Sequence, residues 1–138
     1  MTQRNYREVG SCVIIDKQNR ILLLLRSKTD RWKPGWWDLP GGHLDGDETP
    51  MQGATREAFE ECSLAVRGLI KIEAKEMGSI IKYFFATRDY SGSVGLEPNP
   101  ETGVIEHDEY KWMTIQEIKA LKNSIVPVSI VEEALKHV

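Results

Sequence analysis

Two apolar runs near the start of the chain most constrain its fold. The segments EVGSCVIID (8–16) and RILLLLR (20–26) are joined by the polar, turn-like residues KQNR. Apolar runs of this length bounded by turn residues are typical of core strands. The sequence therefore predicts that the two segments pair as a hairpin and contribute core strands.

Strand signals continue along the chain. Three further strands are expected, at 66–74, 79–87 and 107–113. The segment 31–42 contains two prolines and a glycine pair, which predict a loop around at most a short strand. The segment 89–103 is rich in Gly and Pro and long for a connection, which is typical of functional or mobile loops.

Helix starts are marked by two capping boxes. Thr49 with Gln52, and Thr114 with Glu117, have the three-residue spacing at which a threonine and a polar side chain exchange hydrogen bonds with each other's backbone. These pairs predict one helix from Thr49 and another from Thr114 through about Lys122. A terminal amphipathic helix is expected over residues 127–138.

Length and composition indicate one globular domain over residues 1–138. Hydrophobic residues make up 41% and charged residues 28%, which are ordinary values for a folded domain. A net charge of −3 argues against a broad basic face that binds duplex nucleic acid. Cys12 and Cys62 lie in apolar surroundings and have no disulfide or metal-ligand spacing, so two buried thiols are expected.

The sequence also predicts a cytoplasmic protein without membrane contact. No segment with the basic, apolar and small-residue order of a leader peptide opens the chain, and the longest apolar run, at 21–25, is too short to span a bilayer.

The first predicted helix carries three glutamates along one side, which we call the acidic ridge. With about 100° per residue, Glu57, Glu60 and Glu61 fall within one narrow sector of the helix. The opposite sector is apolar and contains Met51, Ala54, Ala58, Phe59 and Cys62. Glutamates at i, i+3 and i+4 repel each other, and a divalent cation would relieve this repulsion. A solvated face of helix-favouring glutamates is the competing interpretation.

Residues before the ridge favour the cation. Gly53 lies on the acidic sector, where glycine costs about 1 kcal/mol relative to alanine, which suggests a close approach by another segment. We infer that residues 41–47 fold back over the ridge and bring backbone oxygens and Glu48 towards the carboxylates. Oxygen ligands of this kind suit Mg²⁺, which completes its coordination with water and substrate phosphates.

The segment from Gly42 to Leu64 resembles the Nudix box, G-x5-E-x7-R-E-U-x-E-E-x-G-U, in which U is a bulky aliphatic residue. The matching Gly, Glu and Arg positions are Gly42, Glu48, Arg56, Glu57, Glu60 and Glu61. Ser63 stands where the box has its second glycine. Because that glycine would end the helix, the departure bears on the helix terminus more than on the metal site.

The resemblance implies an α/β fold, specifically an α/β/α sandwich in which a mixed β-sheet lies between the box helix and the C-terminal helices. It also implies Mg²⁺-dependent hydrolysis of a pyrophosphate bond in a nucleoside diphosphate linked to another group, with Mn²⁺ as an alternative ion. Glu57, Glu60, Glu61 and the carbonyl of Gly41 would hold the metal. Arg56 would orient a glutamate, and Glu48 would support the loop or bind an outer metal.

A further base is expected downstream, because relatives in this family often take one from a later loop. The segment 104–112 offers Glu106, Asp108 and Glu109, and we favour Glu109 or Glu106 without a spacing rule that selects one.

Candidate substrate contacts come from alternation along strands. Trp37 and Leu39 share one face and are expected in the core, which leaves Trp36 and Asp38 pointing the other way. Two further candidates are Tyr83, on one face of its strand, and His43, within the loop beside the predicted metal. His107 and His137 are expected to be polar surface residues, and Trp112 is expected to serve packing.

The sequence narrows the choice of substrate class but does not select one compound. Ser79 stands where the ADP-ribose subgroup of the family would have proline, which disfavours ADP-ribose. A (d)NTP or another small nucleotide is favoured, nucleic acid is disfavoured, and a capped RNA end stays open. The alternatives are a catalytically silent nucleotide-binding module of the same fold and an interaction domain that uses the helix at 127–138. Many relatives look dimeric, so a homodimer is expected by analogy alone.

Overall fold

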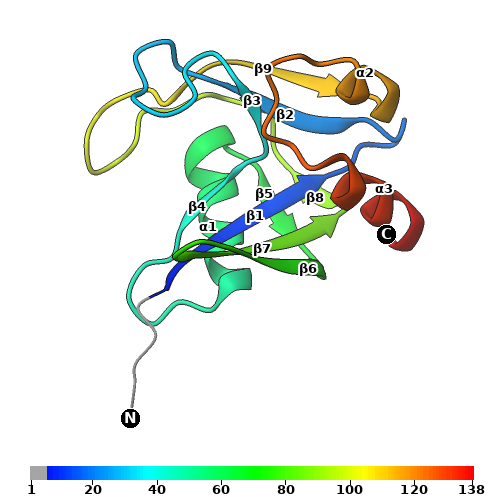
Figure 1. Cartoon of the computed structure of the whole chain (residues 1–138), viewed down its shortest axis with the longest axis horizontal. Helices are drawn as coiled ribbons and strands as arrows, with labels where there is room; N and C mark the ends of the chain where they lie inside the picture. The colour runs from blue at the N-terminus through cyan, green and yellow to red at the C-terminus, as the bar shows by residue number, and fades with distance from the viewer. Residues whose placement is uncertain (1–5) are drawn as a thin grey trace.

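The computed structural model describes residues 6–138, whose strands form three β-sheets (Figure 1). The largest has the strand order β4-β1-β7-β6, with bounds Gly41–His43, Arg7–Ile14, Ile80–Thr87 and Ile70–Met77. In it β1 runs parallel to β7, while β4 and β6 are antiparallel to their neighbours, so the sheet is mixed.

The other two sheets are antiparallel and smaller. One has the order β3-β2-β9, with bounds Trp37–Asp38, Ile21–Arg26 and His107–Met113. The other pairs β5 (Ala65–Arg67) with β8 (Asp89–Ser91). Three helices complete the described chain: α1 (Pro50–Cys62), α2 (Ile115–Lys119) and α3 (Val128–His137).

Strand β1 is buried on both faces and separates two hydrophobic cores. Cys12 and Ile14 lie in a core with Ala58 and Cys62 of α1. Val13 lies in the other core, and the side chains of α3 in that core are Ile130, Val131 and Ala134. Alternating residues of a strand point to opposite faces, so the continuous apolar run supplies both cores at once. The predicted α/β/α arrangement, with a mixed sheet between the box helix and the C-terminal helices, is confirmed.

The predicted hairpin between the first two strands is wrong. Strand β2 also supplies both cores, but it pairs with β3 and β9 rather than with β1. The chain does turn between the two runs, and a single bridge joins Ile15 to Ile21. Beyond that bridge the strands diverge into separate sheets, in which β1 pairs with β7 and β2 pairs with β9.

Other expectations need smaller corrections. The strand expected at 66–74 is divided between β5 and β6 around Gly68, which has φ +62°. Residues 41–43, expected in a loop, form β4, and the helix expected to reach about Lys122 ends at Lys119. The strands expected at 79–87 and 107–113 and the terminal helix are confirmed.

Both ends of α1 are fixed by local chemistry. Thr49 is the N-cap, and it and Gln52 exchange the hydrogen bonds of a capping box, as the sequence predicts. At the other end Ser63 adopts the left-handed conformation (φ 64°) in which a glycine is usual, and its N–H donates to the carbonyl of Phe59. The serine therefore ends the helix at the position where the box has its glycine.

The apolar sector of α1 is narrower than its sequence predicts. Ala54, Ala58 and Cys62 are buried, but Met51 is 43% exposed and Phe59 is 60% exposed. The two cysteines are both buried free thiols, as expected. Burial raises the pKa of Cys62 to about 12, so this thiol is protonated and unreactive at neutral pH.

Helix α1 approaches β1 closely at Gly10. A Cβ atom on Gly10 would lie 2.7 Å from the carbonyl oxygen of Pro50 and 2.9 Å from the nitrogen of Ala54. Both are backbone atoms, which cannot move aside without moving the helix. We therefore expect Gly10→Ala to lower the free energy of unfolding by about 1–3 kcal/mol, as overpacking does in other cores, measured by urea titration.

Gly53→Ala is the matched comparison for this prediction. Its Cβ would meet the side chain of Leu44, which can rotate away, and alanine gains about 1 kcal/mol of helix propensity. We expect this variant to stay within about 1 kcal/mol of the wild type. A cost of Gly10→Ala no larger than that of Gly53→Ala would show that the helix is free to shift at Gly10.

Candidate active site

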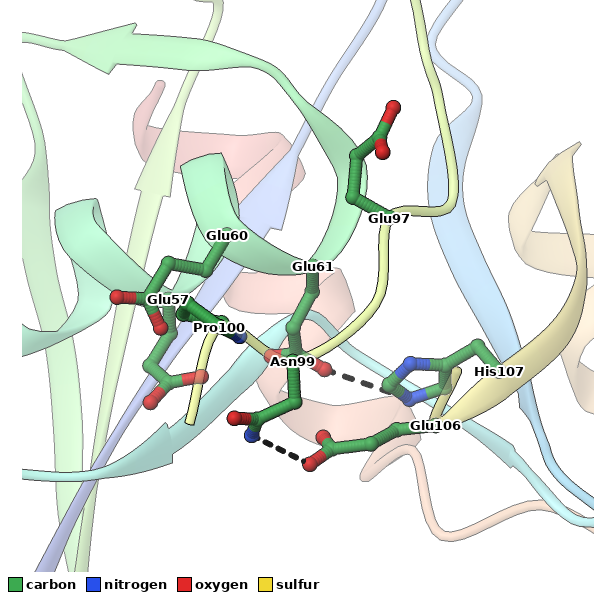
Figure 2. Close-up of a pocket in the computed structure, with 8 residues that line it drawn as sticks. All are labelled: Glu57, Glu60, Glu61, Glu97, Asn99, Pro100, Glu106 and His107. Carbon is green, nitrogen blue, oxygen red and sulfur yellow. Dashed lines mark hydrogen bonds and ion pairs between the residues drawn. The ribbon is translucent and has the colours of Figure 1, made fainter. Parts of the chain in front are cut away.

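The three glutamates of the acidic ridge line one cavity. Glu57, Glu60 and Glu61 of α1 face residues from the loop after β8 and from the start of β9 (Figure 2). The other lining residues are Glu97, Asn99, Pro100, Glu106 and His107. The structure thus brings the predicted Glu106 to the ridge, together with Glu97 and Asn99, which were not predicted.

Arg56 holds the ridge together. Its Nη1 donates to Glu57 Oε1 at 2.9 Å and to Glu60 Oε2 at 3.0 Å. Its Nε donates to Glu48 Oε2 at 2.7 Å, and its Nη2 donates to the carbonyl oxygen of His43 at 2.9 Å. One guanidinium therefore links two ridge carboxylates, Glu48 and β4, and its hydrogen bond lowers the pKa of Glu48.

Glu61 is the buried member of the ridge, with 8% of the residue exposed. Its Oε1 accepts a hydrogen bond from the Gly41 N–H at 2.8 Å, and its Oε2 lies 3.4 Å from His107 Nε2. Burial raises the pKa of Glu61 well above its usual value, and the charge of Glu57 raises it further. A metal ion bound at this carboxyl would offset the cost of burial and favour its ionised form.

His107 is buried, although the sequence predicts a polar surface residue at this position. The residue is only 6% exposed, and burial lowers the pKa of its imidazole from 6.5 to about 4. His107 is therefore neutral at pH 7. Its position depends on the register shift between Leu25 and Arg26, which has no signature in the sequence.

Glycines let β4 reach the ridge. A Cβ atom on Gly42 would lie 2.6 Å from the carboxyl carbon of Glu57, so a larger residue would displace that carboxylate. The close approach expected at Gly53 is also present, because Leu44 and Glu48 from the folded-back segment contact that position. The inference that residues 41–47 cover the ridge agrees with these contacts.

The downstream acids differ in their placement. The Glu106 carboxylate accepts a hydrogen bond from Asn99 Nδ2 at 2.8 Å within the cavity (Figure 2). Asp108 accepts from the backbone N–H of Lys28 at 3.2 Å. Glu109 is exposed on β9 and is not among the residues that line the cavity. The structure therefore brings Glu106, and not Glu109, to the acidic ridge.

The four predicted substrate contacts are dispersed. Asp38 interacts electrostatically with the ridge: its charge contributes to the raised pKa of Glu61, and its own pKa is raised by burial. Trp36 has its ring under Lys33 Nζ at 4.1 Å from the ring centroid. The hydroxyl of Tyr83 donates to Glu8 Oε1 at 3.1 Å, and His43 lines a second hollow at the start of β1.

The donor set suits a hard divalent cation. Five carboxylates border the cavity, and carboxylate oxygens are the ligands that Mg²⁺ prefers in proteins. Within residues 6–138, however, no three acidic, histidine or cysteine side chains are already gathered in metal-binding geometry, and Arg56 holds oxygens of Glu57 and Glu60 instead. The residues fit the ion by their chemistry, and side-chain rotation would complete the site.

Comparisons with known proteins indicate one family for this chain. A family model described as the NUDIX domain matches residues 5–133. An RNA pyrophosphohydrolase of Bartonella tribocorum is 23% identical over 139 residues, which cover 84% of this chain and 80% of that protein. An 8-oxo-dGTP diphosphatase of Proteus vulgaris is 33% identical over 66 residues, which cover 48% of this chain and 58% of that protein.

The fold agrees as well. The crystal structure of the MutT protein from Methanosarcina mazei Go1 matches with a TM-score of 0.72 and 24% identity, over 99% of this chain and 97% of that one. Taken with the family match over nearly the whole sequence, the chain belongs to the Nudix hydrolase family. Among the described residues, every helix is too short or too polar to cross a membrane.

The pKa of His107 predicts how the metal-free protein responds to acid. Because folding lowers this pKa from 6.5 to about 4, the neutral imidazole stabilises the folded state fully above pH 6.5. That stabilisation is lost as the pH falls through this interval, and at about 1.4 kcal/mol per pKa unit the loss is about 3 kcal/mol. Glu61 has the opposite sign, because its raised pKa favours folding in acid.

Urea titrations at pH 7 and pH 4, without divalent ions, separate these contributions. We expect the free energy of unfolding of the wild type to fall by about 3 kcal/mol more than that of His107→Gln, which keeps Glu61 but cannot titrate. An equal fall in the two proteins would contradict the burial of a neutral imidazole at this position.

Proposed function

We propose that the protein catalyses Mg²⁺-dependent hydrolysis of a pyrophosphate bond in a nucleoside diphosphate linked to another group, most simply a (d)NTP or another small nucleotide. One observation carries the proposal: three carboxylates of α1 share a cavity with Glu106, and a guanidinium positions two of them. A solvated acidic helix face would not bury Glu61 or fasten Glu57 and Glu60 to β4 through Arg56.

Different residues of the chain would hold the ion and position its ligands. Glu57, Glu60, Glu61 and the carbonyl of Gly41 would hold the ion, for which Mn²⁺ is an alternative. When bound, the ion would neutralise charge that develops on phosphoryl oxygens and favour ionisation of the attacking water. Arg56 is a positioning residue that orients Glu57 and Glu60, and Glu48 fixes Arg56 in turn. The Gly41 N–H orients Glu61.

Glu106 is the better supported base. It lies in the cavity with its carboxylate oriented by Asn99, so it can accept a proton from a water that attacks phosphorus. Glu109 would need to reach the cavity from an exposed position on β9. Asp38 and His43 lie on segments next to the ridge and are proposed as substrate contacts, together with Trp36 and Tyr83.

The substrate class rests on the cavity and on the relatives. The relatives are named for pyrophosphohydrolase and diphosphatase activities, one on RNA and one on an oxidised nucleotide. Both would present phosphoanhydrides of a nucleotide, and the cavity offers oxygen ligands for an ion that binds such groups. A nucleotide panel should therefore include (d)NTPs, 8-oxo-dGTP and RNA with a 5′-triphosphate or cap. The alternative is a silent nucleotide-binding module of the same fold.

A nucleotide panel with Mg²⁺ tests the reaction. We expect the wild type to release pyrophosphate or orthophosphate from at least one member, and Glu60→Gln to lower kcat/KM by at least about 100-fold because an ion ligand is lost. Glu132→Gln makes the same chemical change on α3, where the side chain pairs with Lys119, and should retain full activity. Binding by calorimetry without turnover would instead support the silent module.

The choice of base has a separate test. We expect Glu106→Gln to lower kcat by about 10²–10⁴-fold, because the proton acceptor is lost. Glu109→Gln should leave kcat unchanged. The reverse order of effects would assign the base to Glu109 and contradict the placement of Glu106.

A further inference from the structure

Trp32 is a large aromatic residue that the structure leaves exposed. It lies in the loop between β2 and β3 and is 54% exposed, whereas Trp36, Trp37 and Trp112 are all partly buried. Trp37 and Trp112 pack against the two cores. Because exposing an indole ring to water is unfavourable, burying this ring against a partner would be favourable.

The ring is nevertheless held in place. The guanidinium of Arg26 lies over it, with Cζ 4.9 Å from the ring centroid, and Arg26 Nε donates to the Trp32 carbonyl at 3.0 Å. The Trp32 N–H donates to Asp30 Oδ1 at 2.9 Å, and Asp30 in turn pairs with Arg26 Nη2 at 2.8 Å. Trp32 is therefore an exposed but fixed residue, which loses little conformational entropy when a ligand binds.

The same contacts place Trp32 beside the acidic cavity. Arg26 is the cross-strand partner of His107, which lines the cavity, and its Nη1 lies 3.7 Å from Asp38. Immediately after Arg26, the Ser27 N–H donates to the carbonyl of Glu106 at 2.9 Å. Figure 1 shows the β2–β3 loop and the loop before β9 at the same end of the molecule.

From these observations we propose that Trp32 is the stacking platform for the nucleobase of the substrate. Arg26 packs on one side of the indole, and the remaining exposed surface can receive a planar base while the phosphates reach the acidic cavity. Because every base has a π-face, stacking favours nucleotides over bare polyphosphates without selecting one base. The exposed side chains of Val104 and Ile105, directly before Glu106, add apolar surface to the same loop end.

This inference rests on the proposed function and differs from the sequence-based expectation for Trp36. The two tryptophans lie in the same loop region, but Trp36 is partly buried and has Lys33 Nζ over its ring at 4.1 Å, whereas Trp32 is exposed. Substitutions of Trp32 and of Trp36 by alanine therefore show which of the two rings contacts the base.

Calorimetry with Mg²⁺ and a nucleoside triphosphate analogue whose α,β and β,γ bridging oxygens are both replaced by methylene, which makes it non-hydrolysable, tests the proposal. We expect Trp32→Ala to weaken binding by about 5- to 150-fold, the cost of one lost base stack, and Trp32→Phe to retain most of the affinity. Phe59→Ala removes an exposed aromatic ring from α1 and should bind as the wild type does. Inorganic tripolyphosphate, which has no base, should bind Trp32→Ala and wild type equally.

Each other outcome overturns the proposal. Unchanged nucleotide binding by Trp32→Ala, or a loss confined to Trp36→Ala, would remove Trp32 as the platform while leaving the proposed reaction intact. An equal loss of tripolyphosphate binding would show that the ring acts through the fold. If the wild type binds no nucleotide and hydrolyses none, the inference and the proposed function fail together.

Discussion

The crowding of negative charge on one face of α1 is the constraint on which the site depends. Three glutamates at i, i+3 and i+4 repel each other, and the protein answers with different partners for each. Glu57 and Glu60 share the guanidinium of Arg56, whereas Glu61 is buried against a backbone N–H and a neutral imidazole. The repulsion between these glutamates is unfavourable for an isolated helix, and contacts with the rest of the fold hold the side chains in place. Such a local conflict is expected where it serves a function.

The two-sided burial of β1 supports this arrangement. One face of the strand packs on α1 and the other on the core that contains α3, while Gly10 lets the helix backbone come close. Because β4 pairs with β1, the same strand also places Gly41 and Gly42 against Glu61 and Glu57. The position of the acidic ridge is thus set by the hydrophobic core, and the loops that face it can vary without moving it.

Features encoded locally could be predicted from the sequence, and those set by distant contacts could not. The capping box of Thr49 and the spacing of Glu57, Glu60 and Glu61 lie within a few residues of one another, so the start of α1 and its ridge were found. The hairpin failed because pairing of β2 was decided by β9, far along the chain. Glu97, Asn99 and His107 join the site through tertiary contacts that leave no local pattern, and the exposure of Phe59 likewise depends on how the rest of the fold packs around α1.

The Arg56 bridge has a consequence for how the ridge meets a metal ion. In the folded chain a covalently attached cation already holds one oxygen of Glu57 and one of Glu60. Unlike a dissolved ion, this competitor cannot diffuse away, and the carboxylates around it keep the Arg56 guanidinium protonated by raising its pKa. A divalent ion that binds those oxygens must displace the guanidinium, which remains attached to the protein. Occupancy of the acidic ridge by a metal therefore depends on the concentration of the ion.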